Sequence, residues 1–434
     1  MLKRLLFLVL SDCGVVLPLA ILCTFFSVAT LNDQFPTGEA AARQVAVTID
    51  RSARVVIVVR DQSDDIEFAE HLQTQIAKPS IAAVVRGEPK DARETLRKLN
   101  QRIDVIACTQ QTASWHSLAD LANDYPALGN PRIVQPTPYL WPDFLKPTNL
   151  RNIASQISII AIIAIGMTMV IITGGIDLSV GSLIALSSVI AATLIRSYCG
   201  GRDAQPLGVI AACAVAILLC AGVGLFTGAV IRGFDVPPFI VTLAMLLIGS
   251  GLAGVISQDQ SINDVPSSFA WLGRGADLFN LPNGVVLMIV LYIAAHILMT
   301  RTRLGRYIYA VGGNREAARL SGVPVGRILI LVYTLSGMLA GVGGIMMASQ
   351  FTSGSHNFGV TYELYTITAV VVGGTSLSGG EGTIYGTLIG AFTTAVIANG
   401  MNLLNVQSRP QMIVLGFVIL GAVIFDSVRR RRRV

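Results

Sequence analysis

Charged residues are scarce in this chain of 434 residues. Asp, Glu, Lys and Arg make up 13% of it, whereas ordinary soluble domains have about 25%. Apolar residues make up 53%, and this balance excludes a purely soluble protein and indicates a membrane protein. The 32 basic residues outnumber the 26 acidic ones, and the excess is gathered in a few loops. That distribution indicates membrane topology rather than nucleic-acid binding.

Paired cysteines and phosphate-binding motifs are also lacking. The six cysteines have no spacing typical of a disulfide framework or a metal site. The pattern Gly-x-x-x-x-Gly-Lys-Ser/Thr does not occur, which excludes ATP binding by that route. We therefore expect no catalytic residues, no metal site and no cofactor bound by this chain.

Long apolar segments predict an all-α polytopic membrane protein with about ten transmembrane helices and glycine-rich breaks. The segments lie at about 14–32, 153–173, 178–196, 207–231, 238–257, 285–300, 326–349, 363–374, 383–404 and 411–428. Lys3 and Arg4 precede the first segment as in a signal peptide, but no convincing small-residue cleavage site lies near Thr30. We therefore expect a retained first helix.

Basic residues predict the orientation, because they gather on the cytoplasmic side of membrane proteins. With both termini cytoplasmic, the inner loops and ends hold 14 Lys and Arg residues. They are Lys3, Arg4, Arg232, Arg301, Arg303, Arg306, Arg315, Arg319, Arg327 and Arg429 to Arg433. The outer side holds Lys146, Arg151, Arg196, Arg202, Arg274 and Arg409, apart from one long hydrophilic segment. The terminal arginines are expected to bind anionic lipid.

The chain is expected to have three parts: a first transmembrane helix at 1–36, an extracytoplasmic insertion at 37–140, and a second transmembrane domain at 141–434. Residues 37–137 hold 12 of the basic and 13 of the acidic residues, as a soluble domain would. Expected strands at 45–49, 55–59, 81–85 and 103–107 alternate with expected helices at 64–77, 89–100 and 114–123. This alternation predicts a small α/β layer with a parallel sheet. Its function is not readable from its residues.

Two glycine-rich breaks interrupt the apolar segments. Residues 172–182 read Ile-Thr-Gly-Gly-Ile-Asp-Leu-Ser-Val-Gly-Ser, and residues 373–380 read Gly-Gly-Thr-Ser-Leu-Ser-Gly-Gly. Five positions match at a spacing of 199, which indicates an internal repeat around a translocation path. The alternative is two glycine-rich helix-packing sites. The path candidates are Gly174, Gly175, Asp177, Ser179, Gly181, Gly373, Gly374, Thr375, Asn399 and Asn402.

Three of these candidates have a structural alternative. A carboxylate at membrane depth is costly, so Asp177 must have partners. We expect Asp177 to cap a half-helix that begins near Leu178, in preference to contacting a substrate. Asn399 and Asn402 either face a polar lumen or bond between helices.

The longest cytoplasmic loop, 300–326, contains a short helix signal. Asn314 can cap such a helix, Glu316 favours its first turn, and Gly322 followed by Pro324 ends it. About two turns do not persist alone in water, so the helix must pack against the membrane domain or another protein. The alternative is an ordinary capped helical loop.

Several spaced motifs resemble one transporter family. Glu316-Ala317-Ala318 followed by Gly322 is similar to the coupling loop of ATP-binding-cassette (ABC) importer permeases. The stretches 166–182, 236–243, 302–306 and 369–377 resemble the ribose-type carbohydrate permeases, in order over about 141–430. Such permeases have a short external loop where this chain has residues 37–140. The resemblance implies that Asn314, Arg315, Glu316, Ala317, Ala318, Arg319 and Gly322 couple the chain to an ATPase.

The resemblance also implies the partners. They are a separate cytoplasmic ABC ATPase that holds the ATP, an extracytoplasmic sugar-binding protein, and a second permease subunit in a bacterial inner membrane. The implied activity is import of a ribose-like monosaccharide. Two alternatives remain: an ion-coupled secondary transporter that uses Asp177, and a membrane-anchored sensor that uses residues 37–140.

Overall fold

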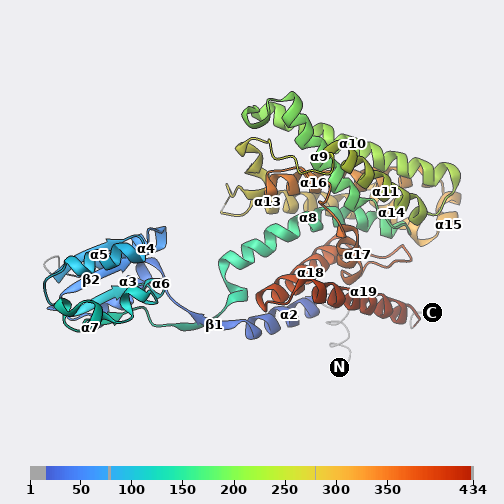
Figure 1. Cartoon of the computed structure of the whole chain (residues 1–434). Helices are drawn as coiled ribbons and strands as arrows, with labels where there is room; N and C mark the ends of the chain where they lie inside the picture. Colours follow the sequence, from blue (N-terminus) through green and yellow to red (C-terminus); the bar gives the residue numbers. More distant parts are fainter. Residues whose placement is uncertain (1–15, 77–79, 279, 432–434) are drawn as a thin grey trace, which may run out of the picture. The chain divides into compact units, whose positions relative to one another are not determined.

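The computed structural model describes residues 16–76, 80–278 and 280–431, which fall into two units (Figure 1). The membrane unit comprises Met1–Thr30 and Asp143–Val434, and the insert unit is Leu31–Pro142. The insert unit is longer at both ends than the expected 37–140. The reason is a two-stranded antiparallel ribbon, in which β1 (Leu31–Gln34) pairs with β6 (Tyr139–Pro142).

The insert unit has a four-stranded parallel sheet with the strand order β3-β2-β4-β5. The strands are β2 (Val55–Val59), β3 (Ile81–Arg86), β4 (Val105–Cys108) and β5 (Arg132–Val134). Helices α3 (Gly38–Thr48) and α4 (Ser63–Gln75) cover one face, and α5 (Pro89–Lys98) packs on the other. Because β2 and β4 are buried on both faces, they consist of apolar residues and cysteine without alternation.

Two elements of the insert unit differ from the sequence-based expectation. The expected strand at 45–49 is wrong, because these residues continue α3 or end it. Ala41, Ala42 and Val45 recur at helical spacing and are buried, whereas Val47 is 88% exposed. The expected helix at 114–123 is a 3₁₀ turn (His116–Leu118) followed by α7 (Leu121–Asp124). Asp120 is the N-cap of α7, because its carboxylate accepts a hydrogen bond from the N–H of Asn123.

The membrane unit is helical. Its helices are α2 (Val16–Ala29), α8 (Pro147–Ile172), α9 (Val180–Tyr198), α10 (Pro206–Phe234), α11 (Pro238–Ser257), α12 (Trp271–Arg274), α13 (Asn283–Arg301), α14 (Arg303–Gly313), α15 (Arg315–Leu320), α16 (Val325–Phe351), α17 (Tyr362–Val372), α18 (Ile384–Leu403) and α19 (Ser408–Arg431).

Seven of these helices are long and apolar enough to cross a membrane: α8, α9, α10, α11, α13, α16 and α18. Three shorter apolar helices are Val16–Ala29, Tyr362–Val372 and Ser408–Ile424. A polytopic membrane protein is therefore the fold class, while the count of ten crossings stays a prediction. Lys3, Arg4, Arg432 and Arg433 lie outside the described residues.

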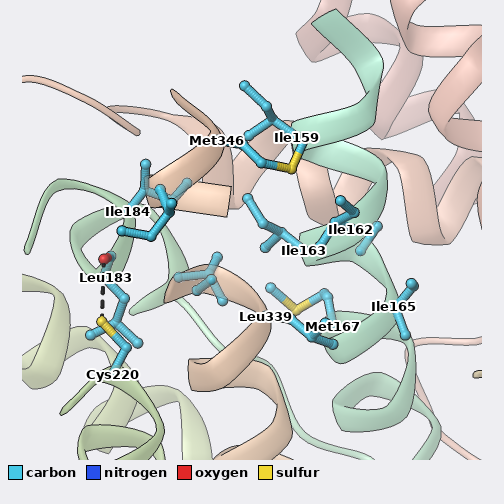
Figure 2. Close-up of a cluster of buried hydrophobic side chains, with 14 of the residues drawn as sticks. Ile159, Ile162, Ile163, Ile165, Met167, Leu183, Ile184, Cys220, Leu339 and Met346 are labelled. Atoms are coloured by element: carbon cyan, nitrogen blue, oxygen red, sulfur yellow. Dashed lines mark hydrogen bonds between the residues drawn. The ribbon is translucent and has the colours of Figure 1, made fainter. Parts of the chain in front are cut away.

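Helix α8 packs at the centre of the membrane unit. From Ile157 to Ile172 every residue except Ile160 is buried, so the helix is apolar around its whole circumference. Figure 2 shows Ile159 of α8, Ile184 of α9 and Met346 of α16 in one buried cluster. Such packing positions the end of α8 and the start of α9, which bound the first helix break of the candidate site.

Helices α8 and α16 approach each other closely at a glycine. A Cβ on Gly166 would lie 2.7 Å from the Cα of Ser336, a separation that real Cβ atoms do not show. Small residues at such crossings allow backbones in membranes to pack closely. The close approach places Ser336 next to the end of α8.

Candidate functional site

Two helix breaks form the candidate site. Helix α8 ends at Ile172 and α9 begins at Val180, while α17 ends at Val372 and α18 begins at Ile384. Both helices end through the same turn. Gly174 and Gly374 have φ angles of +79° and +87°, a conformation that glycine adopts at little cost.

Backbone hydrogen bonds show how the two helix ends correspond. The N–H of Gly175 donates to the carbonyl of Val170 at 3.1 Å, and the N–H of Thr375 donates to that of Val370 at 3.2 Å. At the helix ends the structural equivalence is therefore Gly174 with Gly374, a spacing of 200 residues. The sequence comparison at 199 pairs Gly174 with Gly373, and it is one residue out of register at this point.

The spacing of 199 holds in the turn that follows. The N–H of Ser179 donates to Oδ1 of Asp177 at 3.0 Å, and the N–H of Ser378 donates to Oγ of Ser376 at 3.4 Å. Aspartate and serine side chains commonly make this bond to the N–H two residues on. Two residues separate Gly174 from Asp177, but only one residue separates Gly374 from Ser376. The spacing between equivalent positions therefore changes from 200 at the helix ends to 199 in the turns.

The breaks contact each other directly. The N–H of Gly380 donates to the carbonyl of Ile172, the last residue of α8, at 2.9 Å. Gly379, with a φ of +84°, lies so close that a Cβ would be 3.0 Å from the same carbonyl oxygen. The free carbonyl at the end of one helix is thereby satisfied by the other break.

Asp177 is buried and accepts three hydrogen bonds. Oδ1 accepts from the N–H of Ser179 at 3.0 Å and from its hydroxyl at 2.6 Å, and Oδ2 accepts from the hydroxyl of Ser336 at 2.7 Å. Helix α9 begins at Val180, so the carboxylate holds the turn before the helix rather than a helix start at Leu178. The bond to Ser336 was not expected from the sequence, and it ties the first break to α16.

The expected coupling segment is a helix with one buried side. Asn314 caps α15, as predicted, by accepting a hydrogen bond from the N–H of Ala317 at 2.9 Å. Gly322 follows the helix with a φ of +82°. Arg315, Glu316, Ala317 and Arg319 are exposed, and the last residue, Leu320, is 88% exposed. Ala318 is only 5% exposed and faces its own chain.

The helix before α15 contacts the second break and the end of α8. The hydroxyl of Tyr309 in α14 donates to the carbonyl of Gly382 at 2.7 Å. A Cβ on Gly312 would overlap the carbonyl oxygen of Ile172 and lie 2.6 Å from the amide nitrogen of Gly380. Helix α14, which leads into α15, is therefore in contact with both breaks.

Asn399 and Asn402 lie apart from this contact, whereas Thr375 belongs to the second break. Asn399 and Asn149 exchange two hydrogen bonds, of 2.8 and 3.0 Å, between α18 and α8. Asn402 accepts a bond of 2.6 Å from Gln411 of α19. Both asparagines thus bond between helices. The hydroxyl of Thr375 is buried and has no hydrogen-bond partner among the described residues.

A polar region near residues 352–363 was missed by the sequence analysis. The structure has a cavity of about 100 Å³ there, in which Gly181 of the first break contributes to the lining. The sequence feature that could have indicated this region is the cluster of polar residues between two apolar segments: Ser353, Ser355, His356 and Asn357.

The insert unit also has a polar cluster, at the carboxyl ends of β2 and β4. The strand order changes direction between these two strands, the usual place for ligands in parallel sheets. Here Arg60 and Thr109 both bond to the buried carboxylate of Asp65, at 2.9 and 3.3 Å. The carboxylate of Asp65 is therefore hydrogen-bonded within the cluster. The described residues contain no group of His, Cys, Asp or Glu side chains that could hold a metal ion.

Known proteins match the membrane unit. Residues 149–423 match the family described as "Branched-chain amino acid transport system / permease component". The ribose import permease protein RbsC of Escherichia coli (strain K12) is 44% identical over 295 residues, 67% of this chain and 89% of that protein.

Two further relatives carry other sugar names. The L-arabinose ABC transporter permease protein AraH of Azospirillum brasilense is 37% identical over 292 residues, 67% of this chain and 84% of that protein. The galactose/methyl galactoside import permease protein MglC of Escherichia coli (strain K12) is 35% identical over 302 residues, 67% and 90% of the two chains. These relatives are transport permeases rather than enzymes. No solved structure matches the chain.

Proposed function

The chain belongs to the family of branched-chain amino acid transport system permease components, and on that basis we propose that it is the membrane-spanning subunit of an ATP-driven monosaccharide importer. The relatives that carry the names of ribose, arabinose and galactose permeases support a sugar as the substrate. The observation on which the mechanism rests is the contact of α14, the helix before α15, with both helix breaks at Gly312.

The proposed complex has three kinds of partner. A cytoplasmic ABC ATPase binds ATP and contacts the exposed side of α15, an extracytoplasmic binding protein delivers the sugar, and a second permease subunit completes the path. The chain itself binds no cofactor in this proposal. Its location is the bacterial inner membrane, with both termini cytoplasmic and the insert unit outside. The basic residues around α14 and α15 support this orientation.

The proposed mechanism is alternating access. Closure of the ATPase pair moves α15, and α16 follows because only four residues separate the two helices. The hydrogen bond from Ser336 of α16 transmits this movement to Asp177 in the first break. The contacts of Gly312 and Tyr309 of α14 transmit it to the second break. Both breaks then shift together, which rearranges α8, α9, α17 and α18 around the path.

Reconstitution tests this proposal. The permease is purified with its ATPase, placed in proteoliposomes with the binding protein, and supplied with D-ribose, L-arabinose or D-galactose. We expect uptake of at least one sugar that requires ATP hydrolysis. Uptake driven by a proton gradient in vesicles without the ATPase would support the ion-coupled alternative and overturn the proposal.

A further inference from the structure

Two strained residues enclose the segment between α16 and α17. Thr352 and Thr361 have φ angles of +49° and +68°, in the left-handed region. A β-branched residue adopts this conformation only at an energetic cost, and such residues cluster at functional sites. The segment 352–361 is thus held in an unfavourable backbone conformation at both ends.

The same segment lies along α9. Ser188 accepts a hydrogen bond from the N–H of Ser355 at 3.3 Å and donates one to its carbonyl at 3.2 Å. Two helical turns away, a Cβ on Gly181 would lie 2.7 Å from the carbonyl oxygen of Gly359. Irregular backbone beside a membrane-spanning helix is tolerated only against protein or a water-filled cavity.

A cavity of about 100 Å³ lies where this segment meets α9, α11 and α17. Its polar lining includes Ser182, Ser250, His356, Thr361 and Glu363, and Phe358 adds an aromatic ring. The volume is well above that of one water molecule but below the roughly 300 Å³ of the smallest typical ligand pockets. It can therefore surround part of a small polar molecule.

Two groups in this lining have unused hydrogen-bonding capacity. Nδ1 of His356 is buried and has no partner among the described residues. The Glu363 carboxylate is half-buried, and no other described residue is bonded to it. Oε2 of Glu363 lies so close to the backbone of Gly181 that a Cβ at that position would overlap it. A buried polar atom without a partner is costly, so Nδ1 of His356 is available to bond a polar molecule in the cavity.

We infer that this cavity is the place where the permease contacts the sugar during passage, with Glu363 and His356 as the hydrogen-bonding groups. The inference rests on the proposed function. Carboxylate, imidazole and hydroxyl groups accept from and donate to sugar hydroxyls, and Phe358 covers an apolar ring face. Partial enclosure gives weak contact, which allows release. Asp177, whose oxygens are engaged by Ser179 and Ser336, remains a structural residue.

Substitutions test the contact through selectivity. Glu363→Gln and His356→Ala are assayed in the complete complex for ATP-dependent uptake of D-ribose, L-arabinose and D-galactose. We expect uptake to fall about tenfold, the factor for one charge-assisted hydrogen bond, and the ratio among the sugars to change. Asp235→Asn is the matched control, because Asp235 is exposed after α10 and asparagine tolerates its φ of +51°. An equal loss for every sugar would indicate a structural role and overturn the inference.

Cysteine labelling separates this inference from the proposed function. Ser250→Cys is treated with a maleimide in the complete complex, with and without millimolar D-ribose, L-arabinose or D-galactose, and labelling is located by mass spectrometry. We expect a transported sugar to slow labelling at 250 but not at Ser261→Cys, an exposed control outside the lining. ATP-dependent uptake without protection at 250 overturns the inference alone. ATP-independent uptake, or none of any sugar, overturns the proposed function.

Discussion

At the scale of single residues, Asp177 is a buried carboxylate with a structural environment. It is 2% exposed, and Ser179 and Ser336 together donate three hydrogen bonds to it. A carboxylate at membrane depth without such donors would be costly. Because one donor lies in α16 and two lie before α9, the side chain joins the first break to the helix that follows the coupling segment.

Asparagine should replace Asp177 with little loss. Its Oδ1 can keep both bonds from Ser179, and its Nδ2 can donate to the hydroxyl of Ser336, which then acts as acceptor. Alanine leaves buried donors without partners, at a cost of about 1–3 kcal/mol for each. We expect Asp177→Asn to retain most uptake and Asp177→Ala to lower both the Tm and uptake of the purified complex. An assembled Asp177→Asn complex without transport would show that the charge itself is required.

Gly312 and Gly313 provide a matched pair at the contact of the two breaks. A Cβ at 312 would overlap the backbone of Ile172 and approach that of Gly380, whereas a Cβ at 313 meets nothing within 4 Å. We expect Gly312→Ala to reduce ATP-dependent uptake strongly and Gly313→Ala to leave it unchanged. Uptake in proteoliposomes, at equal amounts of assembled complex, measures this. Equal activity of the two variants would contradict the proposed contact.

Cys108 reports on the insert unit. It is fully buried at the end of β4, and burial raises the pKa of its thiol from 9.0 to about 12. Only the thiolate reacts, so iodoacetamide at pH 8 should label Cys108 in urea but not in the native protein. In the unfolded chain the thiol ionises near pH 9, whereas in the folded chain it stays protonated up to about pH 12. The contribution of buried Cys108 to the free energy of unfolding is therefore fully present below pH 9 and is lost as the pH rises toward 12. Native labelling at pH 8 would contradict the burial.

At the scale of elements, α15 has one side available to a partner. Leu320 is 88% exposed, whereas Ala318 is 5% exposed. Leu320→Glu should therefore remove an apolar contact with the ATPase and reduce uptake per ATP hydrolysed, without lowering the Tm of the permease. Ala318→Glu places a charge inside the chain's own packing, so it should lower the amount of folded protein. Normal coupling in a folded Leu320→Glu complex would exclude this side of α15 as the ATPase contact.

Strong local signals could be predicted from the sequence. The Asn314 cap, and the ends of α8 and α17 just before Gly174 and Gly374, follow from the chemistry of single residues. The contact between the breaks, at Ile172 and Gly380, could not be predicted, because it joins positions more than 200 residues apart. The bond between Asp177 and Ser336, which are 159 residues apart, could not be predicted either.

The segment 352–361 was missed because its residues are those of an ordinary loop. Serine, glycine and asparagine favour turns, and nothing local distinguishes a surface loop from one that packs along α9. The strand wrongly expected at 45–49 has a related cause. Val45, Val47 and Ile49 alternate as in a strand, but the burial of Ala41 and Ala42 in the core of the insert unit selects the helix.

At the scale of the whole molecule, the family match and the insert unit occupy separate parts of the chain. The match covers residues 149–423, and the insert unit ends at Pro142. The alignment with RbsC includes 89% of the length of RbsC but only 67% of this chain. The part of the chain that matches the transport permeases is therefore in the membrane unit, and the insert unit lies outside the matched residues.

The ends of the membrane unit on either side of the insert unit are joined to each other. The N–H of Asp143 donates to the carbonyl of Thr30 at 2.8 Å, and the N–H of Phe144 donates to its hydroxyl at 3.1 Å. Because these residues are already within hydrogen-bonding distance, a short glycine linker can replace Leu31–Pro142 without moving α2 or α8.

Deletion of Leu31–Pro142 should therefore leave transport working. We expect the shortened chain to assemble with the ATPase and to take up sugar at a rate within about twofold of the full chain, since the breaks, α15 and the cavity are all retained. Uptake with ATP in proteoliposomes, at equal amounts of complex, measures this. A shortened chain that assembles and hydrolyses ATP but moves no sugar would make the insert unit part of the transport cycle, as the sensor alternative requires.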